Sequence, residues 1–261
     1  MNKENSRIRQ AFERGKAFIP FITCGDPDLE TTARVVREMA AAGADIIELG
    51  IPFSDPTAEG PVIQAANQRA LSGGVTTDRI FELVRSLRAD ISTPLAFMTY
   101  ANVVFSYGTE RFLETAAAAG VDGLILPDVP FEEKAEFAHP SRAAGVDFVS
   151  LIAPTSRGRI APIAREAEGF VYCVSSMGVT GERSRITTDL SAMVRLVREA
   201  NPTIPCAIGF GVSTPEQARQ MADVADGVIV GSAIVKMIAE QGREAAPAVG
   251  AYVRRMKEAI V

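Results

Sequence analysis

Short apolar runs recur along the chain, separated by longer amphipathic segments. The runs are rich in β-branched residues and are continuous rather than alternating, which is typical of strands buried on both faces of a parallel sheet. We therefore predict eight parallel strands, at residues 17–23, 46–50, 94–100, 124–128, 148–154, 169–175, 204–210 and 227–231.

The segments between the runs repeat their apolar residues with the period of a helix. The spacing i, i+3, i+4, i+7 occurs twice in clear form, at Ile80, Leu83, Val84 and Leu87 and again at Leu190, Met193, Val194 and Val197. Each stripe predicts a helix with one face packed on the sheet. Ala-Gly sequences within 40–45, 117–122 and 143–148 precede strands, and their glycines are expected to end helices in the left-handed conformation.

Eight strands alternating with helices predict an α/β protein, a single (β/α)8 TIM barrel over residues 1–261, since connections between parallel strands are right-handed and such barrels span about 250 residues. An open, doubly wound sheet is the alternative. Residues 6–15 predict an extra N-terminal helix before the first strand, with Ile8 and Phe12 available to cover the bottom of the barrel.

Composition excludes several classes of protein. The 261 residues include 27 Lys and Arg against 32 Asp and Glu, a net charge of −5, which argues against nucleic acid as a partner. No window approaches the roughly 18–20 apolar residues of a membrane span, and residues 1–16 lack the apolar core of a signal peptide. We therefore expect a cytoplasmic protein that does not bind membranes.

Few residues are available for metal binding or for a nucleophilic triad. Cys24, Cys173 and Cys206 are odd in number and lie in or beside apolar runs, which favours reduced, buried thiols. His139 is the only histidine. We expect no metal site, and acid-base chemistry must come from carboxylates, Lys, Tyr or Cys.

Ligands of such barrels bind at the carboxyl ends of the strands, where acidic side chains stand out in two places. Glu48 lies inside an otherwise apolar strand, and an apolar setting can raise its pKa until it serves as both acid and base. A structural carboxylate bonded to a neighbouring strand is the alternative. Asp55 and Glu59 lie in the Pro- and Gly-rich loop 51–64, which is either functional or structural.

Glycines follow the last three strands, at Val179-Thr180-Gly181, Gly209-Phe210-Gly211 and Gly231-Ser232. Their exposed N–H groups, with a helix that starts at Ser232, predict a phosphate site, although ordinary tight turns would give the same pattern. Tyr100, Tyr172 and Asp128 are candidates by position at strand ends. Buried tyrosines with a satisfied hydroxyl are also common in cores.

Seven segments together resemble the tryptophan synthase alpha subunit family almost from end to end: FITCGDPD (21–28), GADIIELGIPFSDPTAEGPVIQ (43–64), FMTYANVVFSYG (97–108), GVDGLILPDVPFEE (120–133), VYCVSSMGVTGER (171–183), IGFGVSTPEQ (208–217) and GVIVGSAIVK (227–236). The resemblance implies a (β/α)8 lyase that cleaves indole-3-glycerol phosphate to indole and glyceraldehyde 3-phosphate without a cofactor of its own. It also implies an αββα heterotetramer with a beta subunit that holds pyridoxal phosphate.

The resemblance assigns a role to each matching position. Glu48 matches the glutamate that moves protons at indole C3 and the glycerol hydroxyl, and Glu59 stands where the family usually has the aspartate that interacts with the indole N–H. The substrate-binding positions are Phe21, Tyr100, Asp128, Tyr172 and Thr180, with Asp128 near the face shared with the beta subunit. The phosphate-binding positions are Gly181, Phe210, Gly211, Gly231 and Ser232.

Two other functions are open at this point. Glu59 is one methylene longer than the usual aspartate, and Ser176-Met177 stands where many members of the family have arginine followed by a small residue. For these two reasons the chain could be a non-catalytic subunit that binds the phosphorylated indole substrate and activates the beta subunit. It could also be a stand-alone lyase that releases indole without a partner. Turnover with and without beta subunit separates these functions.

Overall fold

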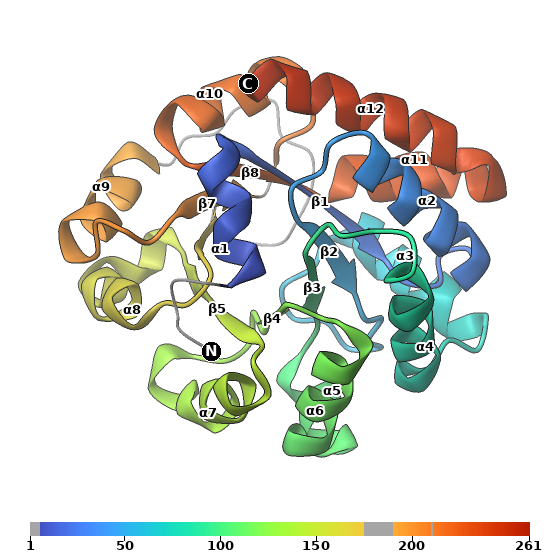
Figure 1. Cartoon of the computed structure of the whole chain (residues 1–261), viewed down its shortest axis with the longest axis horizontal. Helices are drawn as coiled ribbons and strands as arrows, with labels where there is room; N and C mark the ends of the chain where they lie inside the picture. Colours follow the sequence, from blue (N-terminus) through green and yellow to red (C-terminus); the bar gives the residue numbers. More distant parts are fainter. Residues whose placement is uncertain (1–5, 175–189, 210) are drawn as a thin grey trace.

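The computed structural model describes residues 6–174, 190–209 and 211–261. At its centre is a closed barrel in which each strand pairs in parallel with the next, and β1 pairs with β8 through Ala17 and Gly227 (Figure 1). The strands are β1 (Ala17–Thr23), β2 (Ile47–Gly50), β3 (Leu95–Met98), β4 (Gly123–Ile125), β5 (Asp147–Ile152), β6 (Val171–Val174), β7 (Cys206–Gly209) and β8 (Gly227–Val230). The predicted (β/α)8 barrel is confirmed, and the β1–β8 pairing excludes the open sheet.

Helices surround the barrel (Figure 1). They are α1 (Arg7–Ala11), α2 (Leu29–Ala41), α3 (Pro61–Ser72), α4 (Thr77–Leu87), α5 (Ala101–Tyr107), α6 (Thr109–Ala119), α7 (Ala135–Ala144), α8 (Ile160–Glu166), α9 (Leu190–Ala200), α10 (Pro215–Val224), α11 (Ser232–Gln241) and α12 (Ala245–Ile260). Short 3₁₀ turns lie at Phe12–Arg14, Phe131–Glu133, Pro154–Arg159 and Gly242–Glu244. The expected left-handed glycines are present at Gly43 (φ 98°), Gly120 (φ 98°) and Gly145 (φ 79°).

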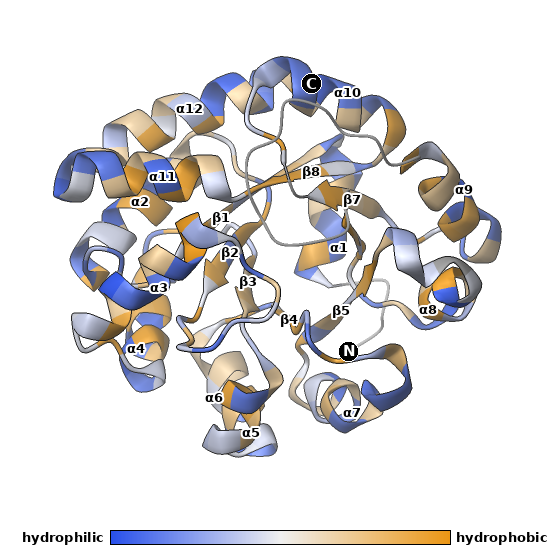
Figure 2. Cartoon of the chain, turned by 180° about the vertical axis from the view of Figure 1, so that it is seen from behind, coloured by the Kyte–Doolittle hydropathy of each residue, from blue (hydrophilic) through white to orange (hydrophobic). Residues whose placement is uncertain are grey.

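Two apolar cores follow from the alternation of side chains along the strands. The stripes predicted on α4 and α9 are buried in the outer core, between strands and helices. The inner core fills the barrel with inward-pointing residues such as Ile19, Ile46, Val149 and Phe170. Figure 2 shows this arrangement as largely hydrophobic strands inside helices that alternate hydrophobic and hydrophilic positions.

Helix α1 covers the bottom of the barrel, as the sequence predicts, and lies across the strands in Figure 1. Ile8 has no exposed surface and belongs to the inner core. A Cβ atom on Gly123 would lie 2.4 Å from its Cδ1 atom, so this glycine makes room for the side chain. Phe12 packs against Phe170, with ring centroids 5.5 Å apart.

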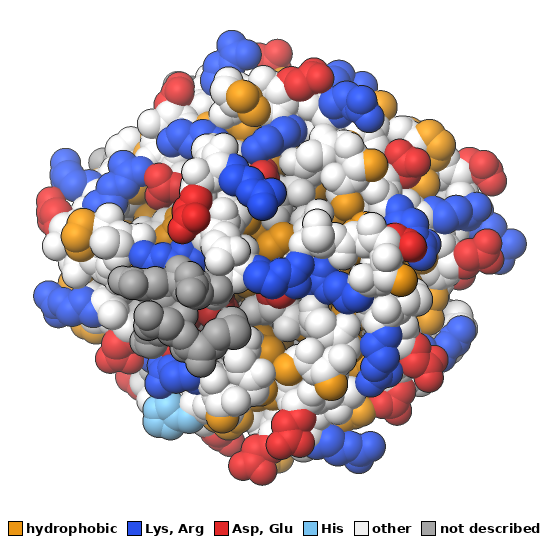
Figure 3. All heavy atoms as spheres, viewed as in Figure 1, with side chains coloured by type: hydrophobic (Ala, Val, Ile, Leu, Met, Phe, Trp, Pro, Cys, Tyr) orange, Lys and Arg blue, Asp and Glu red, His pale blue; other side chains and the backbone are white. Residues whose placement is uncertain are grey.

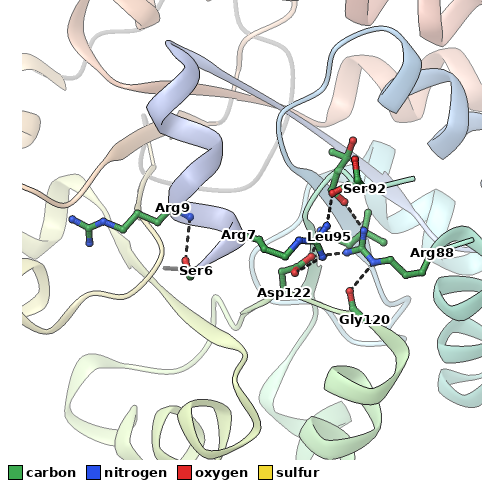
Figure 4. A network of polar contacts seen from close by, with 9 residues as sticks. Ser6, Arg7, Arg9, Arg88, Ser92, Leu95, Gly120 and Asp122 are labelled. Atoms are coloured by element: carbon green, nitrogen blue, oxygen red, sulfur yellow. Dashed lines mark hydrogen bonds and ion pairs between the residues drawn. The ribbon is translucent and has the colours of Figure 1, made fainter. Parts of the chain in front are cut away.

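Polar contacts join α1 to the strand-end loops (Figure 4). Asp122 accepts from Arg7 at 2.8 Å and from Arg88 at 2.5 Å, and Arg7 also donates to the carbonyl of Ser92. Ser6 caps the helix by accepting the N–H of Arg9 at 3.1 Å. These contacts fix the helix over the end of the barrel opposite to the one where the predicted site lies.

Acidic and basic side chains are intermingled over the face that carries α1 (Figure 3). Within the described ranges, no helix combines the length and the apolar character needed to cross a bilayer. Cys24, Cys173 and Cys206 are free thiols and all are buried, as predicted.

Candidate active site

A pocket opens at the carboxyl ends of the strands. Each wall comes from a different part of the barrel, so the fold brings together side chains that are far apart in the sequence. The lining consists of Phe21, Glu48, Ala58, Glu59, Ile63, Met98, Tyr100, Pro127, Tyr172, Gly211, Val212, Ile229, Gly231 and Ser232. Eight of the residues singled out from the sequence thus share one pocket: Phe21, Glu48, Glu59, Tyr100, Tyr172, Gly211, Gly231 and Ser232.

Glu48 points into the barrel because it lies two residues after Ile46 of the inner core and therefore on the same face, whereas Ile47 and Leu49 face the outer core. On β2 it pairs in register with Phe21. The side chain has no exposed surface, and neither carboxyl oxygen has a hydrogen-bond partner in the described part of the chain. Burial raises the pKa of Glu48 to about 8, because the charged form loses its hydration. A carboxyl group that is largely protonated at neutral pH can donate a proton and then take one back.

Glu59 enters the same pocket from the loop before α3. Burial raises its pKa to about 7, and hydrogen bonds from Asn67 and Tyr100 act in the opposite direction. Asn67 donates to Oε2 at 2.7 Å. The pocket therefore holds two carboxyl groups whose pKa values lie near neutrality, which is typical of acid-base sites.

Tyr172 lies on the opposite wall, on β6. Its pKa is raised by burial and then by the charge of Glu48, so the hydroxyl keeps its proton. The ring stacks on Phe170 with centroids 6.3 Å apart, and Phe170 contacts Phe12 below. A column of aromatic rings thus supports this wall from the bottom of the barrel.

Glycines and a helix terminus form the third part of the site. Gly211 has φ 82°, a value that glycine adopts without strain, and Gly231 precedes α11. Helix α11 begins at Ser232, as predicted, and both Gly231 and Ser232 line the pocket. No Lys or Arg is among the described lining residues. An anion here would therefore rely on backbone N–H groups, the Ser232 hydroxyl and the helix dipole.

Four predicted positions are not brought into this pocket by the described structure. Asp128 is exposed and absent from the lining; its carboxylate accepts the N–H of Ala101 at 3.1 Å, at the start of α5. Thr180, Gly181 and Phe210 lie outside the described residues, as does Ser176, on which the regulatory alternative partly rests.

Sequence reasoning missed Asn67, whose side chain contacts Glu59. Its signal was present, since Asn67 falls on the stripe formed by the buried residues Ile63, Ala66 and Ala70 of α3. A polar residue in an apolar stripe indicates a specific partner. The pocket-lining residues that were missed are apolar or small, namely Ala58, Ile63, Met98, Pro127, Val212 and Ile229. Across the described ranges, no three His, Cys, Asp or Glu side chains form a metal-binding group.

Comparisons of the sequence and of the fold with known proteins point to the same family. A family model described as "Tryptophan synthase alpha chain" matches residues 8–261. The tryptophan synthase alpha chain of Lacticaseibacillus casei is 46% identical over 98% of this chain and 96% of its own length. Structural matches include Mycobacterium tuberculosis tryptophan synthase (TM-score 0.89, 35% identity, 98% of both chains). Another is the tryptophan synthase a2b2 complex of Pyrococcus furiosus (TM-score 0.83, 37% identity, 94% of this chain and 99% of that one). The chain belongs to the tryptophan synthase alpha chain family.

Proposed function

We propose that Glu48 and Glu59 are the two acid-base groups with which this alpha chain carries out its lyase reaction, the cleavage of indole-3-glycerol phosphate to indole and glyceraldehyde 3-phosphate. The observation that carries the proposal is the pair of carboxyl groups in one largely buried pocket, with pKa values near 8 and 7. A retro-aldol cleavage needs one proton delivered, one removed and a positive charge stabilised, and two such groups can do all three.

Glu48 has the proton-transfer role. In its protonated form it gives a proton to C3 of the indole ring, which makes the ring electron-poor. The resulting carboxylate takes the proton of the glycerol hydroxyl next to the bond that breaks. The electrons of that C–C bond return to the ring as indole leaves, and the hydroxyl carbon becomes the aldehyde. Glu48 ends in the protonated form in which it began.

Glu59 acts as a carboxylate. Protonation at C3 places positive charge on the ring nitrogen, and an ionised carboxylate beside the N–H stabilises that charge. The pKa of about 7 lets a large fraction of Glu59 be ionised at neutral pH. Phe21, Tyr100 and Tyr172 supply the apolar and aromatic walls that suit an indole ring.

The phosphate end of the substrate is assigned to Gly211, Gly231 and Ser232, at the N-terminus of α11. Family resemblance adds Thr180 as a substrate-binding residue and Gly181 and Phe210 as phosphate-binding residues. Holding the phosphate orients the reacting carbon against Glu48, and orientation of this kind accounts for a large part of catalysis.

A beta subunit is the proposed partner, in an αββα assembly in the cytoplasm, with pyridoxal phosphate bound by that partner and not by this chain. The similarity to an a2b2 complex supports the assembly. The docking face is assigned to the mouth of the barrel, where Asp128 caps α5 and Phe105 of the same helix is 64% exposed. Exposed aromatic rings are enriched at protein interfaces.

The test is indole release from indole-3-glycerol phosphate by the full chain, alone and with saturating beta subunit, compared with Glu48→Gln and Glu59→Gln. We expect slow release that rises strongly with the partner, and a loss of at least about 10²-fold in Glu48→Gln. Asp147→Asn is the matched control, because Asp147 is also a carboxyl group with a raised pKa, about 6, but lies at the start of β5.

Each outcome separates the functions. Near-normal turnover in Glu48→Gln contradicts the role of that residue. No release by the unmodified chain in either state, with phosphate ligand still bound, indicates a regulatory subunit. Fast release that beta subunit leaves unchanged indicates a stand-alone lyase.

A further inference from the structure

Asn67 is a buried amide on an otherwise apolar helix stripe. Its residue surface is 4% exposed, and the Nδ2 atom donates to Oε2 of Glu59 at 2.7 Å. Burying an amide is unfavourable unless it is hydrogen-bonded, so this contact offsets the cost of placing Asn67 in the core. Because α3 is a regular helix packed on the barrel, Asn67 is a fixed point from which the loop side chain is held.

Tyr100 provides a second donor from another element. Its hydroxyl oxygen accepts the N–H of Ala58 at 3.2 Å, which leaves the hydroxyl proton for the Glu59 carboxylate that Tyr100 contacts. The Tyr100 ring packs against Phe53, with centroids 5.3 Å apart. The carboxylate is thus held from two directions, by α3 and by the segment after β3.

The length of the Glu59 side chain makes these donors important. Glutamate has one more rotatable bond than the aspartate that usually occupies this position in the family, so more orientations of its carboxylate compete. A displacement of about 1 Å in a reacting group can cost ~10²-fold in rate. A fixed donor to one oxygen selects a single orientation.

We propose that Asn67 is a positioning residue for the cleavage reaction, whose amide holds the longer Glu59 side chain in place and keeps its carboxylate ionised. The inference rests on the proposed role of Glu59. Asn67 acts through Glu59, so its loss changes how well Glu59 performs and not which reaction occurs.

The surroundings of Glu59 determine the direction in which its pKa changes when Asn67 is replaced. The titratable side chains that line the pocket with Glu59 are Glu48, Tyr100 and Tyr172. The pKa of Glu59 is raised mainly by burial and lowered by its bonds with Asn67 and Tyr100. Removing the Asn67 donor therefore raises the pKa of Glu59 further. At neutral pH a smaller fraction of Glu59 is then ionised.

The experiment measures kcat and KM for indole release as a function of pH in Asn67→Leu, which keeps the number and branching of the side-chain heavy atoms and removes the donor. We expect the acidic limb of kcat/KM to move upward by about one pH unit, with a loss of about 10-fold at neutral pH that falls mainly on kcat. The loss should shrink as the pH rises. Asn67→Ala serves the same purpose if the leucine variant does not fold.

Gln64→Leu is the matched control. Gln64 lies on the same helix and donates through the same kind of amide at the same 2.7 Å, but to the backbone carbonyl of Glu59. We expect its acidic limb to coincide with that of the unmodified chain. If Asn67→Leu gives the same profile as Gln64→Leu, the proposal is overturned.

Two further variants separate this inference from the function on which it rests. Glu59→Gln with normal turnover removes Glu59 from the mechanism, whatever Asn67 does. In a Glu59→Asp background the shorter side chain places the carboxylate farther from α3. Asn67→Leu should therefore lower the rate of indole release at neutral pH by less than about 3-fold in that background, against about 10-fold with glutamate. An equal loss of rate in both backgrounds would show that Asn67 does not act through the Glu59 side chain.

Discussion

At the residue scale, Glu48 links function to stability. A carboxyl group with no exposed surface and a pKa of about 8 can ionise only against the cost of losing water. The same burial that makes the group a proton donor at neutral pH therefore works against the folded state once the proton leaves. The site is retained at a cost in stability that depends on pH.

Glu48→Gln should reveal that cost. In the unfolded chain the carboxyl loses its proton near its ordinary pKa of 4.5, whereas the folded protein keeps the proton up to about pH 8. Between these values the unfolded state binds fewer protons, so the free energy of unfolding falls as the pH rises. Glutamine removes this dependence, and the variant should gain on the order of 4 kcal/mol relative to the parent between about pH 5 and pH 9.

Urea denaturation of both proteins across this range measures the gain. Asp147→Asn is the control, because its pKa of about 6 confines any such dependence to lower pH. A difference between Glu48→Gln and the parent that stays constant from about pH 5 to pH 9 would contradict the prediction.

Residue patterns predicted part of the site. Glu48 stands out because it interrupts an apolar strand, and Gly231-Ser232 because glycine before a helix start is a common anion site. The apolar lining, such as Ile63 and Met98, could not be predicted from residue type, since core and pocket walls have the same composition. Only the closure of the barrel decides which buried residues face the ligand.

At the scale of elements, the sequence predicted every strand but not every boundary. The run 124–128 was expected as a strand, whereas β4 is Gly123–Ile125, since Pro127 has no N–H to offer a neighbouring strand. The strand predicted at 94–100 is shorter in the structure, Leu95–Met98, because Tyr100 is already the N-cap of α5. Strand ends depend on the pairing partner and on the loop that follows, which periodicity does not report.

Helix α1 shows how an element can close a barrel with few residues. Ile8→Ala removes a fully buried side chain from a space bounded by Gly123 and Gly169, which have no side chains of their own to fill it. We expect the variant to lose about 2–4 kcal/mol of unfolding free energy. Urea denaturation at a fixed pH measures the loss.

Gln10→Ala in the same helix is the control, because Gln10 is exposed and its replacement should cost less than about 0.5 kcal/mol. Indole release should be unchanged in both variants under conditions where they are folded, since neither residue lines the pocket. A cost for Ile8→Ala no larger than that for Gln10→Ala would show that α1 is not part of the cooperative core.

At the scale of the whole molecule, the two ends of the barrel have different tasks. The bottom is closed by α1, which is held by the ion pair between Arg7 and Asp122, while the mouth carries the pocket and the loops. Separating stability from chemistry in this way leaves the mouth free to meet a partner. Sequence periodicity predicts the barrel but not the face that binds a partner. An exposed apolar residue in a short helix cannot be distinguished from a buried one by its position in the sequence pattern.

Phe105 is the position at which the proposed docking face can be tested. This residue is 64% exposed on α5, the helix whose first N–H is held by Asp128. Phe105→Asp places a charge where the proposed contact loses water, and we expect affinity for the beta subunit to fall by at least about 10-fold. Indole release by the chain alone should be unchanged, because Phe105 does not line the pocket.

Titration of beta subunit into each variant, followed by the rise in indole release, gives the affinity and the stimulated rate together. Leu196→Asp is the matched control, since Leu196 is also an exposed apolar residue, 36% exposed, but lies on α9. A lower affinity with the same maximal rate assigns Phe105 to docking alone. Equal affinities for Phe105→Asp, Leu196→Asp and the parent would instead place the interface elsewhere on the molecule, because burying an unpaired carboxylate in a protein contact is too unfavourable to pass unnoticed.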